Sequence, residues 1–226
     1  MASKVRMALR ALGFQSARPL HLEPSQSFAA VFPSSLLSHL VRINVVGDGH
    51  CGAYVLAILN FALQRKVSPQ TQIRRSIYQL ACAQTRCRLP PALWNEFAQT
   101  FRRIAKDAYL NDTEMVLFLQ AQRLNVHVLT PAKVMVVQSF AVSDPVGHVF
   151  LVFSHGCHWE ILARAAQRTP GGFSPIWTMR SGNALLMHLR AMRAVMREGA
   201  TPVATYTTIL NEVPLFRIDA DDRLWV

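Results

Sequence analysis

The feature that most constrains the fold is a glycine-containing turn that runs directly into an apolar segment. The turn, residues 47–52, reads Gly-Asp-Gly-His-Cys-Gly, and the seven residues that follow it, 53–59, are all apolar or aromatic. Glycine lets the backbone turn tightly, and an uninterrupted apolar run must be buried. We therefore predict a helix over about residues 51 to 65 that begins at Cys51 and packs on the core.

The position of Cys51 at the start of this helix suits thiol chemistry. The first N–H groups of a helix have no acceptor within the helix, and the positive end of its dipole favours a thiolate over a thiol. The same N–H groups can bind an oxyanion. A free cysteine is more often a small buried hydrophobe, so Cys51 needs a partner base to count as a nucleophile.

A candidate base lies about a hundred residues downstream. Residues 149–162 read as two strands joined by a short turn, with His158 at the start of the second strand. Residues two apart on a strand share a face, so Glu160 is expected beside His158, where its carboxylate would orient the imidazole. The other histidines near this region, His127, His148 and His155, have no carboxylate two residues on.

These motifs resemble those of the ovarian tumour (OTU) family of cysteine deubiquitinases. The similar features are Asp48-Gly49-His50-Cys51 before a helix, a late histidine followed by an aromatic residue, and the segments 110–115 and 124–129 between them. The resemblance covers about residues 40 to 165. It implies a papain-like α+β fold in which helices pack on a small, mostly antiparallel sheet.

The resemblance also implies a role for each site residue. Cys51 would be the nucleophile, His158 the general base and Glu160 the orienting residue, and the oxyanion would be bound by backbone N–H groups of Asp48, Gly49, His50 and Cys51. Substrate contacts are expected from Trp159, Asn111 and His155. The chain departs from the family pattern twice. Glu160 stands where the family has Asn or Asp, and Gly52 stands where it has a bulky residue.

The implied activity is hydrolysis of the peptide or isopeptide bond after the C-terminal glycine of ubiquitin or a ubiquitin-like modifier, with no cofactor. An OTU-like viral protease that cleaves its own polyprotein would use the same residues, and a Cys-Gly pair resembles the papain-like proteases of certain positive-strand RNA viruses. A host or bacterial-effector deubiquitinase is the interpretation that we place ahead of the viral protease. Cys82 and Cys87 have a spacing seen in zinc sites, but no second pair follows, so no metal site is predicted.

The net charge of +11 is not explained by the resemblance. Such a charge draws proteins to nucleic acid, anionic membranes or acidic partners. A catalytically silent nucleic-acid-binding protein on the same fold is therefore the alternative that is not an enzyme. Few cysteines and the thiol chemistry favour a reducing, intracellular compartment. Residues 1–22 lack acids and resemble a transit peptide, and no apolar run is long enough to span a bilayer.

The chain divides by composition into three segments. These are a basic N-terminal extension over 1–33, a catalytic domain over 34–166, and a C-terminal extension over 167–226 that follows a Pro/Gly-rich cluster. Helices are predicted at about 34–41, 51–65, 69–85, 92–108, 111–124 and 183–198. Strands are predicted at about 125–130, 134–142, 148–154, 157–164, 203–209 and 213–218. The helix over 183–198 is expected to be amphipathic, with a basic stripe at Arg190, Arg193 and Arg197.

Overall fold

The computed structural model describes residues 7, 9–20, 32, 34–88, 91, 102–106, 108–131, 136–165, 172–198, 216–218 and 224–225. Its centre is a nine-stranded sheet in the order β4-β3-β5-β6-β7-β8-β9, with β2 also paired to β6 and β1 paired to β2. The strands are β1 (Phe14–Pro19), β2 (Leu40–Val45), β3 (Leu124–Thr130), β4 (Val136–Phe140), β5 (Gly147–Ser154), β6 (His158–Ala165), β7 (Gly172–Ser174), β8 (Phe216–Ile218) and β9 (Leu224–Trp225).

The sheet is mostly antiparallel, as predicted. Among the strands that the structure describes, only β3 and β5 run parallel, and every other pair is antiparallel. Strand β6 is the central element because β5 occupies one of its edges, while β2 and β7 share the other. The N-terminal end of β6, where His158 lies, pairs with the end of β5 across the hairpin, and β2 joins β6 from Ile161 onward.

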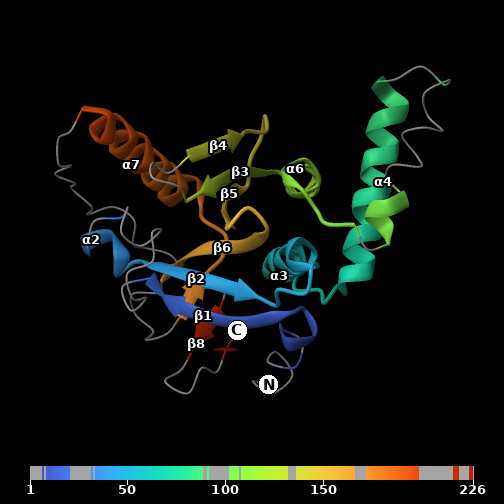
Figure 1. Cartoon of the computed structure of the whole chain (residues 1–226), viewed down its shortest axis with the longest axis horizontal. Helices are drawn as coiled ribbons and strands as arrows, with labels where there is room; N and C mark the ends of the chain where they lie inside the picture. The colour runs from blue at the N-terminus through green and yellow to red at the C-terminus, as the bar shows by residue number, and fades with distance from the viewer. Residues whose placement is uncertain are drawn as a thin grey trace.

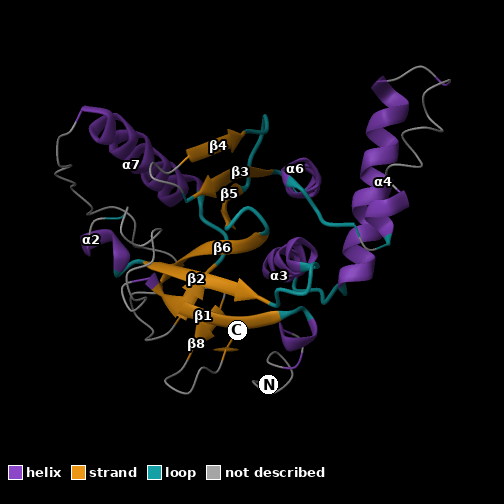
Figure 2. Ribbon diagram, viewed as in Figure 1, coloured by secondary structure: helices purple, strands orange, loops and turns teal. Residues whose placement is uncertain are grey.

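Helices cover both faces of the sheet (Figures 1 and 2). The described helices are α2 (Ser34–Leu37), α3 (Cys51–Gln64), α4 (Gln70–Arg88), α6 (Asp112–Ala121) and α7 (Met179–Glu198). Helices α3 and α6 lie on one face, α2 and α7 belong to the core of the other, and α4 and α7 stand at opposite ends of the view. The structure thus confirms an α+β architecture in which the helix that begins at Cys51 packs on the sheet.

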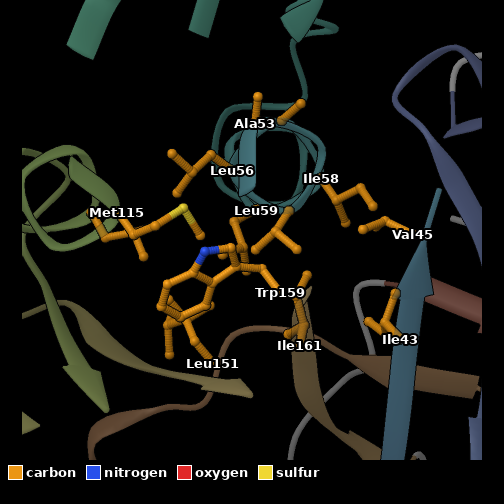
Figure 3. Close-up of a cluster of buried hydrophobic side chains, with 14 of the residues drawn as sticks. Ile43, Val45, Ala53, Leu56, Ile58, Leu59, Met115, Leu151, Trp159 and Ile161 are labelled. Atoms are coloured by element: carbon orange, nitrogen blue, oxygen red, sulfur yellow. The ribbon is translucent and has the colours of Figure 1, made fainter. Parts of the chain in front are cut away.

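Alternation along the strands separates the two cores. On β5, Val149 and Leu151 face α3 and α6, whereas Phe150 and Val152 face α7. This is the period of two that a strand buried on both faces requires. Figure 3 shows the α3 side, where side chains of the helix meet those of β2 and β6. Burial on both faces makes the sheet a rigid support for the residues at its edge.

Most predicted elements are present, with ends shifted by a few residues. One exception is the predicted helix over 34–41, since α2 ends at Leu37 and β2 begins at Leu40. Strands β7 and β9 are further exceptions, and β7 lies in the Pro/Gly-rich cluster that predicted a turn. Strand β1 was also not predicted, and it pairs with β2 over most of its length. Most of the predicted helix over 92–108 and the predicted strand over 203–209 lie outside the described residues.

The predicted boundaries at residues 33 and 166 do not separate folding units. Strand β1 comes from the N-terminal extension, yet it continues the central sheet through β2. Strand β7 from the C-terminal extension pairs with β6, and α7 contributes Leu185, Leu186 and Leu189 to one core. Both extensions therefore add to the domain that holds the site.

Candidate active site

Cys51 is the first residue of α3, and its side chain is buried. The turn before it needs glycine, because Gly49 has a φ of +89°, a conformation that other residues rarely adopt. The backbone N–H of Cys51 lies in the first turn of the helix, where N–H groups have no acceptor within the helix. The structure thus places a thiol and a backbone donor together at the positive end of the helix dipole, as predicted from the sequence.

The Cys51 thiol lies close to the start of β6. Its Sγ donates to the backbone carbonyl of Cys157, the residue before His158, over 3.9 Å. The imidazole of His158 lies against the loop that leads to Cys51, since a Cβ built on Gly47 would be 3.8 Å from both Nδ1 and Cε1 of His158. Two segments about a hundred residues apart in sequence therefore bring the predicted nucleophile and base to one edge of the sheet.

Asn44 is the hydrogen-bond partner of His158. Its Oδ1 lies 2.8 Å from His158 Nε2, while its Nδ2 donates to Gln15 Oε1 over 3.1 Å. Because the Asn44 amide nitrogen already donates to Gln15, the amide oxygen faces the imidazole and His158 Nε2 carries the hydrogen. In the neutral ring this leaves a lone pair on Nδ1, which is the nitrogen that can accept the thiol proton.

Glu160 does not take the orienting role that the sequence predicted. Its carboxylate is buried, and Oε2 accepts from Nε of Arg42 at 2.8 Å and from the Ser154 hydroxyl at 3.2 Å. Nη2 of Arg42 reaches the same oxygen at 2.8 Å. Arg42 and Asn44 lie two residues apart on β2 and face the same side as His158 and Glu160. Arg42 therefore pairs with the Glu160 carboxylate, and the Asn44 amide pairs with the His158 imidazole.

The predicted oxyanion hole loses one of its donors. The backbone N–H of His50 donates to Oδ1 of Asp48 over 3.0 Å, and Tyr54 donates its hydroxyl to Oδ2 over 2.8 Å. Burial opposes ionisation of Asp48, but these hydrogen bonds outweigh it and hold its pKa below the usual value. The His50 N–H is thus committed to a carboxylate that stays ionised, which corrects its expected role in binding substrate.

Trp159 cannot contact a substrate as predicted, because it is only 1% exposed. Its indole N–H donates to the Leu110 carbonyl over 2.8 Å, and its ring packs under α3 beside Met115 (Figure 3). A Cβ on Gly52 would lie 3.0 Å from Leu110 Cβ, 3.1 Å from Met115 Sδ and 3.3 Å from Trp159 Cδ1. Leu110, Met115 and the indole together therefore fill the space that a bulky side chain after Cys51 would need, which accounts for Gly52.

The two other predicted substrate contacts remain at the surface. Asn111 caps α6, accepting from the N–H groups of Thr113 and Glu114, and the Glu114 side chain accepts from the Asn111 N–H. An Asn with a Glu three residues later, as at Asn111 and Glu114, is the sequence pattern of such a capping box. His155 is exposed in the turn between β5 and β6, with a φ of +54°. The capping role of Asn111 and the exposed position of His155 leave both substrate contacts as predictions.

Two residues near Cys51 were not identified from the sequence. Arg74 of α4 is buried and donates to His50 Nδ1 over 2.9 Å, to the Ile104 carbonyl and to the Ala108 carbonyl. Burial first, and then the charge and hydrogen bonding of Cys51, raise the pKa of the Tyr109 phenol. Arg74 follows no motif, and Tyr109 lies in a loop, so their proximity to Cys51 appears only in the folded chain.

Among the described residues, neither the other cysteines nor a metal site extends the group of side chains around Cys51 and His158. All four cysteines are free, with Cys82 partly exposed and Cys87 and Cys157 exposed. Within the described residues, no group of three or more His, Cys, Asp or Glu side chains is arranged to hold a metal ion. No helix in the described part of the chain has the length and apolar character needed to cross a membrane.

Solved structures that are similar to this chain are OTU domains, which is the resemblance that the sequence motifs predicted. An OTU domain in complex with ubiquitin is 13% identical, with 73% of this chain and 92% of that chain covered and a TM-score of 0.49. An OTU deubiquitinase from Wolbachia pipientis is 13% identical, with 58% and 90% covered and a TM-score of 0.43. The viral OTU domain protease from Farallon virus is 14% identical, with 56% and 85% covered and a TM-score of 0.42.

No protein-family model and no curated protein matches this chain. Identities of 12–16% and TM-scores below 0.5 are too low to carry an inference about chemistry. The chemistry of this chain is therefore inferred from its own residues.

Proposed function

We propose that this chain is a thiol-dependent hydrolase that cleaves the bond after the C-terminal glycine of ubiquitin or a ubiquitin-like modifier. The observation that carries the proposal is the arrangement of Cys51 at the start of α3 and His158 beside the preceding loop, with Asn44 fixing the imidazole. Nucleophile, base and orienting group are what covalent acyl transfer requires. The choice of modifier rests on the resemblance of the motifs to OTU deubiquitinases.

The proposed reaction begins with proton transfer from Cys51 to Nδ1 of His158. The thiolate then attacks the carbonyl carbon of the terminal glycine, and the backbone N–H of Cys51 stabilises the oxyanion. When the tetrahedral intermediate collapses, the carbon–nitrogen bond breaks and His158 returns the proton to the leaving amine. Water then releases the acyl group from Cys51 by the reverse sequence.

Turnover of ubiquitin carrying a C-terminal fluorogenic amide tests the proposal, with several ubiquitin-like modifiers in parallel. We expect Cys51→Ala to abolish hydrolysis, because the proposed acyl intermediate forms on the Cys51 thiol. We expect His158→Ala to come close to abolishing it, since general acid–base catalysis typically contributes roughly 100- to 10,000-fold. Full activity in purified Cys51→Ala protein would refute the assignment.

A nucleic-acid-binding function is the second candidate, and the net charge of +11 favours it. It predicts binding to RNA or DNA that weakens steeply with salt, together with no turnover of any modifier. The geometry favours the enzyme, because nucleic-acid binding does not require a thiol beside an oriented imidazole. Self-cleavage of a longer precursor, lost in Cys51→Ser, would instead indicate a polyprotein protease that uses the same site.

The cellular compartment follows from the same chemistry. We propose that the protein works in the reducing interior of a cell or host cell, because the mechanism needs Cys51 as a free thiol. The four free cysteines of the structure support this proposal.

A further inference from the structure

We propose that Gln15 is a further positioning residue, whose side chain sets which end of the Asn44 amide faces His158. The inference rests on the proposed function, because the direction of this amide affects turnover only if His158 is the base. Gln15 lies on β1, in the segment predicted to be an extension outside the catalytic domain. Its Oε1 accepts a hydrogen bond from Asn44 Nδ2 over 3.1 Å, and Asn44 Oδ1 lies 2.8 Å from His158 Nε2.

A β-bulge gives Gln15 its position beside Asn44. Ser16 pairs with Asn44, whereas Phe14 pairs with the residue of β2 that follows Asn44, so Gln15 is an extra residue on β1 (Figure 1). Phe14 and Ala17 accordingly pack on the same core, although strand alternation puts residues three apart on opposite faces. Bulges re-aim side chains and are common next to active sites. Here the bulge brings the Gln15 side chain within hydrogen-bond distance of the Asn44 amide.

The three side chains form a hydrogen-bonded chain that can run in two directions. In the structure, His158 donates from Nε2 to the Asn44 oxygen, and the Asn44 nitrogen donates to the Gln15 oxygen. If the Asn44 amide turned around, its nitrogen would face Nε2, and the hydrogen of the neutral ring would move to Nδ1. The proton of Cys51 would then have no acceptor at Nδ1. An acceptor at position 15 therefore favours the direction that the reaction needs.

The same direction suits the charged ring that forms during turnover. When the S–H bond of Cys51 breaks and its proton moves to Nδ1 of His158, both ring nitrogens carry hydrogen, and Nε2–H needs an acceptor. The Asn44 oxygen is that acceptor, because the Asn44 nitrogen is held by Gln15. Gln15 thus acts through Asn44 and not on the reacting atoms.

Side chains that only accept or only donate hydrogen bonds test this role. Gln15 is exposed, so its side chain can be changed without loss of core packing. A carboxylate only accepts, and Gln15→Glu should hydrolyse the C-terminal fluorogenic amide of ubiquitin at the unmodified rate. An ammonium only donates. We expect Gln15→Lys to lower kcat by about 10- to 100-fold with little change in KM, less than the roughly 10,000-fold loss of a histidine in the wrong tautomer, because lysine can also turn to solvent.

The tautomer of His158 gives a readout that needs no substrate. It is measured in Cys51→Ala protein, where no thiol can protonate the ring, at a pH where the imidazole is neutral. NMR spectra of the labelled imidazole nitrogens should place the hydrogen on Nε2 when position 15 is Gln or Glu. In Gln15→Lys a fraction of the molecules should carry it on Nδ1. A purely structural role of Gln15 would not change this tautomer.

Gln138→Lys is the matched control, because Gln138 is exposed on β4, and β3 and β5 separate β4 from β6. This change should leave both turnover and the His158 tautomer unaltered. Equal turnover in Gln15→Lys and Gln15→Glu would overturn the inference, and so would an unchanged tautomer in Gln15→Lys. If the unmodified protein hydrolyses no modifier, the proposed function has failed, whereas the tautomer still reports whether Gln15 sets the direction of the Asn44 amide.

Discussion

At the scale of the residue, the clearest result concerns the group that orients His158. Asn44 and Glu160 lie on neighbouring strands and face the same side, yet only the amide of Asn44 contacts the imidazole. The carboxylate of Glu160 instead forms a buried pair with Arg42. Under the proposed mechanism, Asn44 serves catalysis and Glu160 serves stability.

Substitution of these two residues should separate the two roles. We expect Asn44→Ala to lower kcat by about 10- to 100-fold, a part of the roughly 100- to 10,000-fold that general acid–base catalysis contributes. Glu160→Ala leaves Arg42 without the carboxylate that it pairs with, and loss of one partner of a buried pair costs about 3–5 kcal/mol of unfolding free energy. Fluorogenic turnover and urea unfolding of both variants measure the two effects.

The opposite pattern would contradict this division. If Glu160→Ala retained full stability and lost turnover, while Asn44→Ala retained turnover, the carboxylate would be the orienting group. Asn44→Asp serves as a matched control, because it keeps an oxygen acceptor at the same position as the amide and should retain more activity than Asn44→Ala.

At the scale of the element, β3 and β5 carry a buried histidine pair away from the site. His127 Nε2 lies 2.8 Å from His148 Nδ1, and His127 Nδ1 lies 2.9 Å from the Ser139 hydroxyl of β4. Phe150 stacks on His127, and Arg190 of α7 adds positive charge nearby. Burial, followed by the charges of His148 and Arg190, lowers the pKa of His127 to about 3.

This pair predicts a loss of stability in mild acid. Because the folded pKa lies below the unfolded value, the unfolded chain binds the proton first, and stability falls as the pH drops below about 6.5 towards 3. At pH 5, His127 alone should cost about 2 kcal/mol of unfolding free energy. Urea unfolding at pH 7.5 and pH 5 measures the loss, and His127→Gln, which does not titrate, should show a smaller one. Equal losses in both proteins would contradict the assignment.

The element that sequence patterns missed is the one that completes the site. Residues 40–45 read Leu-Val-Arg-Ile-Asn-Val, and Val41, Ile43 and Val45 alternate with polar residues as a half-buried strand requires. The preceding residues favour a helix, and no local motif marks Asn44 as a site residue. Even a correct strand prediction leaves open which strand β2 pairs with, because pairing between residues 118 apart is set by packing.

Other parts of the site followed from local patterns. The turn before Cys51, the helix after it, the hairpin with His158 and the capping box at Asn111 each depend on a few adjacent residues, and all are present. Trp159 was misassigned for a geometric reason. Its neighbour His158 lies at the site, but alternate residues of a strand face opposite sides, so the indole points into the core beneath α3.

At the scale of the whole molecule, the sheet joins three parts of the sequence into one site. The N-terminal segment supplies β1 and so Gln15, β2 supplies Asn44, and β6 supplies His158. Helix α3 then sets Cys51 at the same edge, and Arg74 of α4 and Trp159 of β6 hold the loop that contains Tyr109. No local stretch contains the site, which is why the fold must form before the thiol can act.

The measurement that tests the central claim most directly is mass mapping of the adduct formed with ubiquitin, or another modifier, that carries a C-terminal electrophile. We predict one adduct, on the buried Cys51, that persists in Cys157→Ser and is lost in Cys51→Ala. This selectivity is informative because Cys87 and Cys157 are exposed thiols and would react first in undirected alkylation. An adduct on Cys157, or none on Cys51 from folded protein with any modifier, would contradict the account.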